Sequence, residues 1–216
     1  ISNITSSDII DIAGIYSFSC NFNITANNTV ESINTVTGQP KGIYMVSGFR
    51  NVISANNISG IESGSNYSPI GMDFSAPNNH IIEKNKISNV IKSTNSNYAA
   101  GIRILNGYGE TSLRNNFVWN ILATSSYGLR LDRDGYQNTE VYHNSINLFG
   151  NIPNQSGSIH AALKLINSTN GLDIKNNIFV CGIDNLNNND EKSYGIHCQS
   201  TDTSFTVIDH NDYYAY

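Results

Sequence analysis

Aromatic and charged side chains recur at one position of the chain, two residues after a glycine or alanine that opens each of several similar segments. Side chains of these types bind polysaccharides, because rings stack on the C–H faces of sugars and charged groups bind hydroxyls or uronate carboxylates. The chain has only 12 Lys and Arg and 17 Asp and Glu, so their concentration at this position favours a binding site. The candidate substrate-binding residues, with one acid two residues further on, are Tyr16, Tyr44, Asp73, Arg103, Arg130, Asp132, Lys164 and His197.

The same residues have a purely structural explanation, which the sequence leaves open. An exposed sheet face must be polar, and opposite charges on neighbouring strands reduce repulsion whether or not a ligand binds. Asp73 beside Arg103 would then be a surface ion pair worth ~0–1 kcal/mol. Arg130 with Asp132 and Lys164 would be a second group of the same kind.

These side chains must be positioned by an internal repeat of about 30 residues, which two independent marks reveal. The first mark is a Gly–apolar pair, with Ala in one copy, and the second is an Asn that stands two residues before an apolar or aromatic residue. The pairs begin at Gly14, Gly42, Gly71, Gly101, Gly128, Ala162 and Gly195. The Asn marks are Asn28, Asn56, Asn85, Asn115, Asn144, Asn176 and Asn211. Two marks that keep one period in seven copies predict a stacked architecture.

Each repeat has the pattern of short β-strands joined by turns. In the segment from Gly101 to Ile104 the two Ile side chains face one way and Arg103 the other, which is the period of a strand. Ser, Asn and Gly fill the intervals, and no segment has a helical period with caps. Three short strands cannot bury a face alone, so the repeats must stack. We therefore predict an all-β, single-stranded parallel β-helix of about seven rungs, which fits the period better than a leucine-rich repeat or a propeller.

Several segments resemble the right-handed parallel β-helix repeats of the pectate-lyase-like superfamily, among them 55–58, 114–117, 143–146 and 175–178, which read ANNI, RNNF, HNSI and KNNI. The resemblance extends from about Ala13 to Asn211. It implies a right-handed coil with an asparagine ladder, in which stacked amides hydrogen-bond from rung to rung. The segment 209–214 also resembles repeat ends in large secreted proteins of Bacteroidetes-type bacteria. The resemblance thus implies a secreted or cell-surface protein in which residues 1–216 form a single β-helix domain, as a segment of a longer chain.

This superfamily includes lyases, hydrolases, adhesins and inert stalks, so the resemblance implies the fold more strongly than the activity. In a lyase of this superfamily, a Lys or Arg side chain acting as the base removes the proton next to a uronate carboxylate, and a second, cationic side chain neutralises that carboxylate. Arg130 and Lys164 are best placed for these roles. A glycoside hydrolase needs two carboxylates ~5–9.5 Å apart, for which Asp73 with Asp132, or Asp132 with Asp134, are candidates. The superfamily's calcium enzymes use clustered acids. Here Asp73 and Asp132 are two rungs apart, so Ca²⁺ is weakly supported and no metal ligands are predicted.

The composition of the chain excludes several classes of partner and site. A net charge of −5 without a Lys or Arg block argues against nucleic acid. No apolar run approaches ~18 residues, so no membrane span is predicted. Cys20, Cys181 and Cys198 contain no CxxC pair, which argues against a zinc site. A disulfide between Cys181 and Cys198 and three free, buried thiols are both compatible with the sequence.

The regular repeat, without a compact acid–base motif, favours a secreted or cell-surface module with a structural, adhesive or glycan-binding role. Its expected partners are a polysaccharide or cell-surface glycan and the neighbouring domains of a longer chain. The alternative is a polysaccharide lyase or glycoside hydrolase acting on an acidic polysaccharide. The sequence does not decide whether the protein is an enzyme.

Overall fold

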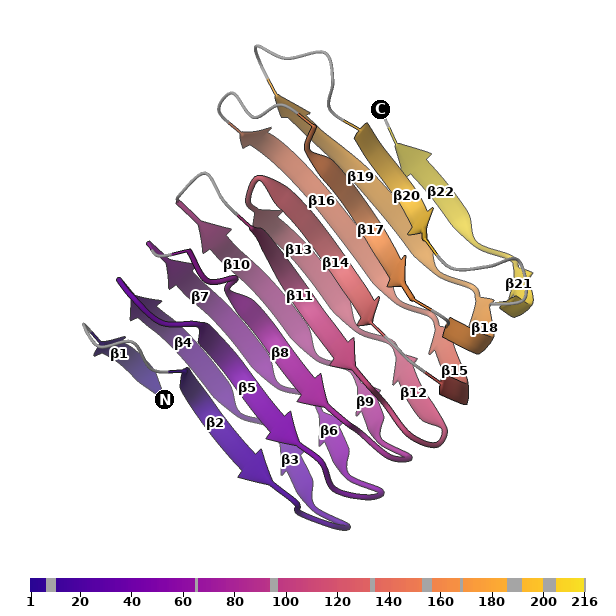
Figure 1. Cartoon of the computed structure of the whole chain (residues 1–216), viewed down its shortest axis with the longest axis horizontal. Coiled ribbons are helices and arrows are strands. Elements are labelled where there is room, and N and C mark those ends of the chain that lie inside the picture. The colour runs from indigo at the N-terminus through magenta and orange to yellow at the C-terminus, as the bar shows by residue number, and fades with distance from the viewer. Residues whose placement is uncertain are drawn as a thin grey trace.

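The computed structural model is a β-solenoid in which three parallel sheets enclose one apolar core (Figure 1). It describes residues 1–6, 11–64, 66–93, 97–132, 135–152, 157–167, 169–185, 192–199 and 205–215. We name the sheets A, B and C; along the chain the strands follow the order B, C, A, and each pairs with the equivalent strand one coil later. No helix occurs among the described residues. The prediction of an all-β parallel β-helix of about seven rungs is confirmed.

Sheet B faces the viewer in Figure 1 and carries the candidate residues on its outer side. Its inward side chains form continuous aliphatic rows, such as Ile43, Met72, Ile102, Leu129 and Leu163, all of which are fully buried. Its seven strands are β2 (Ile12–Phe18), β5 (Pro40–Val46), β8 (Ile70–Ser75), β11 (Tyr98–Leu105), β14 (Ser125–Asp132), β17 (Ile159–Ile166) and β20 (Lys192–Cys198).

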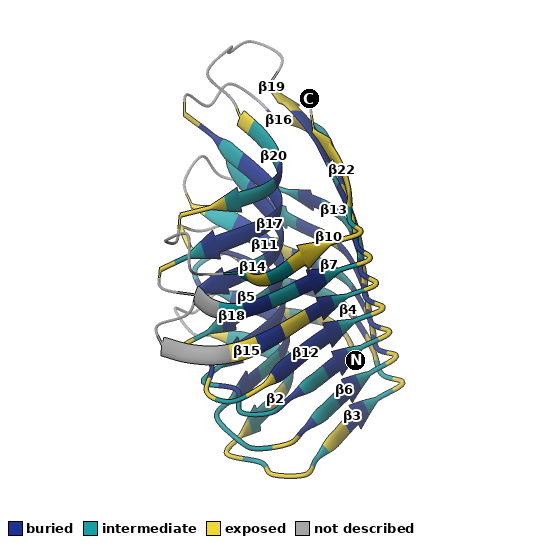
Figure 2. Ribbon diagram, turned by 90° about the vertical axis from the view of Figure 1, so that its right-hand side faces the viewer, coloured by how far each residue is buried: buried dark blue, intermediate teal, exposed yellow. Residues whose placement is uncertain are grey.

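Sheet C has the shortest strands in its first coils, and its strands β3, β6, β12 and β15 lie above one another in Figure 2. Its inward rows, including Ile53, Ile82, Leu113, Val141 and Ile174, complete the core on this side. Its strands are β3 (Ile24–Ala26), β6 (Val52–Ser54), β9 (Ile81–Glu83), β12 (Thr111–Arg114), β15 (Gly135–Tyr142), β18 (Thr169–Lys175) and β21 (Phe205–Asp209).

Sheet A contains eight strands, because the N-terminal strand pairs with the first complete coil. Its inward residues, such as Val30, Ile58 and Ile87, pack against sheet B. Its strands are β1 (Ser2–Ser6), β4 (Thr29–Thr35), β7 (Asn57–Ser63), β10 (Lys86–Lys92), β13 (Phe117–Leu122), β16 (Ser145–Ile152), β19 (Ile178–Asn185) and β22 (Asp212–Ala215).

The glycine mark of the repeat has a packing cause. A Cβ atom on Gly101 would lie 2.3 Å from Cγ1 of Val118 and 2.7 Å from the carbonyl oxygen of Gly128. The first neighbour belongs to the core and the second to the backbone of the next coil, so neither can move cheaply. The close approach of sheets A and B therefore requires a minimal residue here, and Ala162 fills the same place in one coil.

An asparagine ladder connects successive coils where sheet C turns into sheet A. The Oδ1 atom of each ladder residue accepts hydrogen bonds from the backbone N and the side-chain Nδ2 of the preceding one, at 2.8–3.1 Å. Each amide is thereby satisfied along the solenoid axis. The ladder consists of Asn28, Asn56, Asn85, Asn116, Asn144, Asn177 and Asn211.

Two of the seven Asn marks expected from the sequence were wrong by one residue. Asn115 and Asn176 point to solvent, and their neighbours Asn116 and Asn177 occupy the ladder. Asn115 and Asn176 take the position just before it, where the backbone is left-handed with φ of 54° and 56°. Asn tolerates this conformation better than most residues.

The left-handed residue before the ladder also yields a stability prediction. Ala55 occupies this position with φ of 52° and is exposed, although an alanine there pays a steric penalty of roughly 1–2 kcal/mol. Asn27, Asn115 and Asn176 hold the equivalent position in other coils. We expect Ala55→Asn to raise the free energy of unfolding by about 0.5 kcal/mol.

Urea unfolding measures this change, with Ser54→Asn as the control. Ser54 ends strand β6 one residue earlier and is not among the residues with positive φ, so its replacement should give no gain. An equal gain from both variants would contradict the backbone explanation.

Candidate functional site

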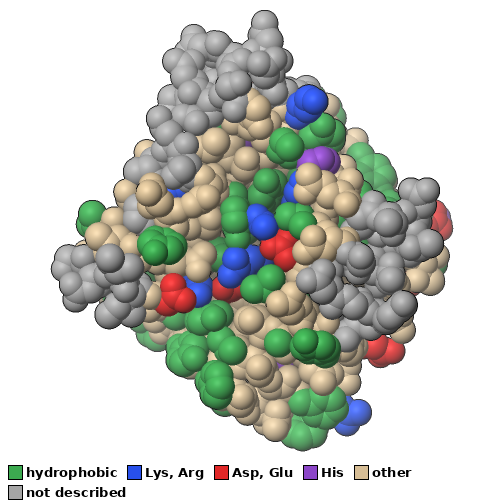
Figure 3. Space-filling view, viewed as in Figure 1, with side chains coloured by type: hydrophobic (Ala, Val, Ile, Leu, Met, Phe, Trp, Pro, Cys, Tyr) green, Lys and Arg blue, Asp and Glu red, His purple; other side chains and the backbone are tan. Residues whose placement is uncertain are grey.

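The predicted row of side chains is present on the outer face of sheet B. Strand register places successive members directly opposite one another, from Tyr16 on β2 to His197 on β20. Lys, Arg, Asp and Glu side chains group near the centre of this face among hydrophobic ones in Figure 3. In register order the row is Tyr16, Tyr44, Asp73, Arg103, Arg130, Lys164 and His197; Asp132 belongs to the parallel row two residues further along the strands.

Asp73 is the centre of a buried ion-pair network. It is fully buried, and its two carboxylate oxygens accept hydrogen bonds from Nε and Nη2 of Arg103, both at 2.8 Å. Lys41, which is 2% exposed, lies 3.5 Å from Asp73 and 2.9 Å from Asp11. Nη1 of Arg103 donates to the hydroxyl of Tyr98 at 2.7 Å. The arrangement fixes the guanidinium in one orientation, as bidentate pairs do.

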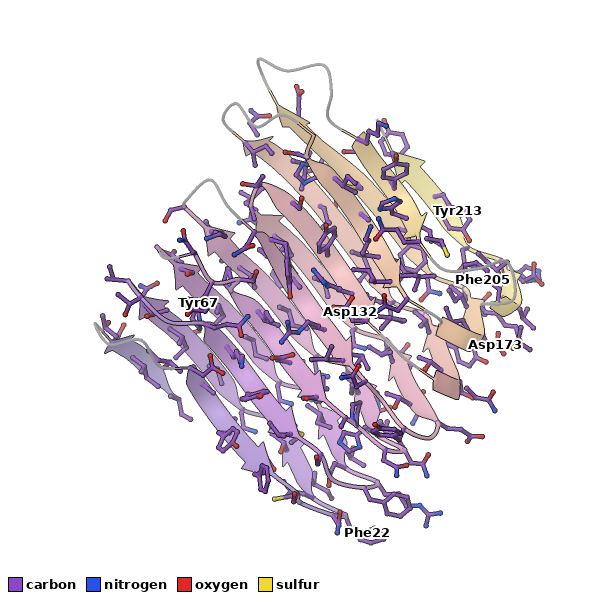
Figure 4. The ribbon with its side chains drawn as sticks, viewed as in Figure 1. Phe22, Tyr67, Asp132, Asp173, Phe205 and Tyr213 are labelled. Atoms are coloured by element: carbon purple, nitrogen blue, oxygen red, sulfur yellow. The ribbon has the colours of Figure 1, made fainter. Side chains whose placement is uncertain are left out.

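Arg130 belongs to a second group, one coil further on. Its Nε donates to Oδ2 of Asp132 at 2.7 Å, and its guanidinium carbon lies 3.8 Å from the ring centre of Tyr98. Asp132 lies on the outer face near the middle of the sheet (Figure 4). Its Oδ1 is buried without a hydrogen-bond partner in the described part of the chain. One carboxylate therefore faces the two cations Arg130 and Lys164.

Lys164 is the buried lysine of the row. It is 2% exposed, and its Nζ lies 2.5 Å from Nδ1 of His197. Burial, followed by the positive charge of Arg130, lowers the pKa of Lys164 to about 8, against the opposing effect of Asp132. Burial and Lys164 also lower the pKa of His197. Lys164 and His197 together therefore carry fewer than two positive charges near neutral pH.

The aromatic members provide the open part of the face. Tyr16 is 59% exposed, and its ring centre lies 5.4 Å from that of Tyr44 at a tilt of 37°. Both rings line a hollow of about 590 Å³ with Asp11, Ile12 and Ala13. Nζ of Lys41 lies 3.5 Å from the ring centre of Tyr44 and holds it from one side.

One expectation about the charged residues changes with the structure. The interaction of Asp73 with Arg103 is not a solvent-exposed surface pair, because the carboxylate is fully buried and Arg103 is 14% exposed. Asp73 and Asp132, the two acids considered for hydrolysis, are each bound to an arginine. Asp134 lies outside the described residues. Among those described, no three His, Cys, Asp or Glu side chains are grouped as metal ligands.

Several residues of the site were missed at the sequence level. Tyr98 and Tyr127 pack at 5.6 Å between ring centres, and Tyr194 stacks on His197 at 4.6 Å. A second row could have been found from the same glycine mark, because its members stand one residue before the repeat glycine. They include Lys41, Tyr127 and Tyr194. Sequence alone could not reveal that Lys41 is buried beneath Tyr44.

The three cysteines are free thiols: Cys181 is buried, Cys20 is half-buried and Cys198 is exposed. No disulfide therefore joins Cys181 to Cys198. The sequence was compatible with a disulfide or with three free, buried thiols. The thiols are free, but Cys181 alone is buried among them.

Comparison with known proteins gives no further identification. The chain matches no protein-family model, no curated protein and no solved structure. The described residues contain no helix that could cross a membrane. The resemblance to the pectate-lyase-like superfamily therefore stays a prediction beyond the parallel β-solenoid itself.

Proposed function

We propose that this chain is a secreted or cell-surface β-solenoid module that binds a polysaccharide along the outer face of sheet B without cleaving it. One observation carries this conclusion: the charged side chains of the row are mostly buried and paired, whereas the ring of Tyr16 at its end is exposed beside the half-buried Tyr44. Buried, paired charges hold a surface rigid, and exposed rings bind the apolar faces of sugars. Arg103 and Arg130 keep 14% and 16% of their side chains exposed, so we expect a preference for acidic sugars.

Replacement of Tyr16 by Ala tests the binding proposal. Loss of the exposed Tyr16 ring should raise the dissociation constant of the oligosaccharide complex by about tenfold. The stacking surface beside Tyr44 disappears in this variant, while the ion pairs remain. Calorimetric titration with uronate and neutral oligosaccharides measures the change. Tyr108→Ala is the control, since Tyr108 is 56% exposed but lies outside the row. Unchanged affinity in Tyr16→Ala, or no binding of any oligosaccharide, would contradict the proposal.

A lyase is the second candidate, and the lowered pKa of Lys164 is the observation that favours it. A lysine with a pKa of about 8 is largely neutral just above that pH and can accept a proton, while Arg130 neutralises a substrate carboxylate. The assay follows the ultraviolet absorbance of the 4,5-unsaturated product on uronate polysaccharides. An activity that rises with pH through about 8, and that Lys164→Ala abolishes, would replace the non-catalytic proposal. Its absence from a folded, sugar-binding sample is the result we expect.

A further inference from the structure

A second concave surface lies on sheet C, away from the row on sheet B. Two hollows of about 400 and 230 Å³ adjoin there and share Glu110 and Glu140 among their lining residues. The larger begins near Arg50 and the smaller ends near Thr206. Together they follow the solenoid axis across successive coils, so the groove is elongated rather than round.

The floor of the groove is a row of hydrogen-bond acceptors. Ser112, Glu140 and Asp173 are register neighbours on β12, β15 and β18, at the ~4.8 Å spacing of paired strands. Ser112 is 9% exposed, and its buried Oγ has no hydrogen-bond partner in the described part of the chain. The buried Oδ1 of Asp173 also lacks one, whereas Oδ2 binds Tyr142 and Lys175. Ser112 lines the larger hollow and Asp173 the smaller one, so hydrogen-bond donors bound in the groove would lie beside these two side chains.

The charges around the groove favour a cationic ligand. Glu110 and Glu140 form no ion pair with any residue that the structure describes. The nearby cations are engaged, since Arg114 pairs with Glu83 at 2.8 Å and Lys175 pairs with Asp173 at 2.9 Å. Arg50 stands at one end, with its guanidinium 4.8 Å from the ring centre of Phe49. The centre of the groove thus holds two free carboxylates between two unsatisfied acceptors.

We propose that this groove binds an extended oligosaccharide of amino sugars, whose free ammonium groups face Glu110 and Glu140 and whose hydroxyls reach Ser112 and Asp173. The acceptors recur once per coil, and this spacing is close to the length of one unit in an extended sugar chain. The three acceptors of this row, Ser112, Glu140 and Asp173, belong to side chains. An extended peptide would need free backbone partners, and strands β9, β12, β15 and β18 are paired on both sides. The site is independent of the proposed function of sheet B.

Titration of the full chain with a β-1,4-linked glucosamine hexamer, at a pH where its amines are protonated, tests the proposal. We expect binding that Glu140→Gln weakens by about tenfold or more, because a charge-assisted contact is lost. Glu31→Gln is the matched control, since Glu31 is exposed on strand β4 of sheet A and should leave the affinity unchanged. The fully N-acetylated hexamer should bind much more weakly. No binding, equal binding of both hexamers, or an affinity that Glu140→Gln leaves unchanged would overturn the proposal.

Two further measurements test whether the groove prefers the sugar to any cation, and whether Ser112 acts in binding or in stability. If oligolysine binds as tightly as the glucosamine hexamer, and if Glu140→Gln weakens both equally, the assignment to a sugar is overturned. Ser112→Ala should weaken hexamer binding several-fold without lowering the urea midpoint, because the hydroxyl has no partner among the residues that the structure describes. A lowered midpoint with unchanged affinity would overturn the role given to Ser112.

Discussion

Replacement of Asn116 by Leu is expected to lower the free energy of unfolding by about 3–5 kcal/mol. Asn116 is 1% exposed, and its Oδ1 accepts from both the backbone N and Nδ2 of Asn85 at 3.1 and 3.0 Å. Its Nδ2 donates to the carbonyl oxygen of Ile82 at 2.8 Å. Leucine can make none of these bonds. The backbone groups of Asn85 and Ile82 would be left buried without these partners, and the ladder would be broken at its centre.

Urea unfolding followed by circular dichroism measures the loss, with Asn115→Gly as the matched control. Asn115 is the adjacent residue and the same amino acid, but it is exposed and has a φ of 54° that glycine adopts readily. We expect the control to change stability by less than about 1 kcal/mol. Equal losses in the two variants would show that the amide ladder does not stabilise the coil.

The contrast between Asn115 and Asn116 also shows what the sequence could reveal about the ladder. The resemblance to known repeats predicted its existence, and the chemistry agrees, because stacked copies of an amide can satisfy one another along the solenoid axis. Its register was ambiguous wherever two Asn residues are adjacent. The copies with a single Asn contain the missing signal: Lys84 and His143 precede Asn85 and Asn144, and each of these ladder residues stands two residues before a fully buried apolar residue, Ile87 or Ile146.

On sheet B the register was predictable and the burial was not. The glycine spacing correctly placed Asp73 opposite Arg103 and Arg130 opposite Lys164. Side chains on an outer face are normally solvated, so the sequence suggested weak surface pairs. The burial of this pair involves side chains from other positions of the repeat: Lys41, one residue before a repeat glycine, lies 3.5 Å from Asp73, and Tyr98 accepts a hydrogen bond from Arg103.

The acceptor row of sheet C was not predictable by the same method. Ser112, Glu140 and Asp173 follow no repeated residue type, and register shifts interrupt the pairing of β15 with β18 and of β18 with β21. A constant offset from the glycine mark therefore does not bring these three residues together. Each stands four residues before a ladder residue, Asn116, Asn144 or Asn177, so the register of the ladder aligns them once it is known.

The network around Asp73 leads to the second large expected effect. Replacement of Arg103 by Met should lower the free energy of unfolding by about 3–5 kcal/mol, because it leaves a fully buried carboxylate with only the 3.5 Å contact to Lys41. Replacement of both partners, as Asp73→Leu with Arg103→Met, should cost less than the single change. Lys41 then keeps Asp11 as its partner, and no buried charge stands alone. Urea unfolding of Asp73→Leu, Arg103→Met and the double variant gives the coupling free energy between the two residues.

Arg114→Met is the matched control, because its pair with Glu83 has the same 2.8 Å distance but Arg114 is 42% exposed. We expect a loss of less than about 1 kcal/mol there. If Arg103→Met cost no more than this control, the charges of sheet B would be surface pairs that are free to exchange partners. They would then be available to a substrate, and the case for a rigid, non-catalytic binding face would fail. A large loss for Arg103 alone means that this arginine stabilises the fold. The exposed ring of Tyr16, beside the half-buried Tyr44, is then the part of the face that we expect to contact a ligand.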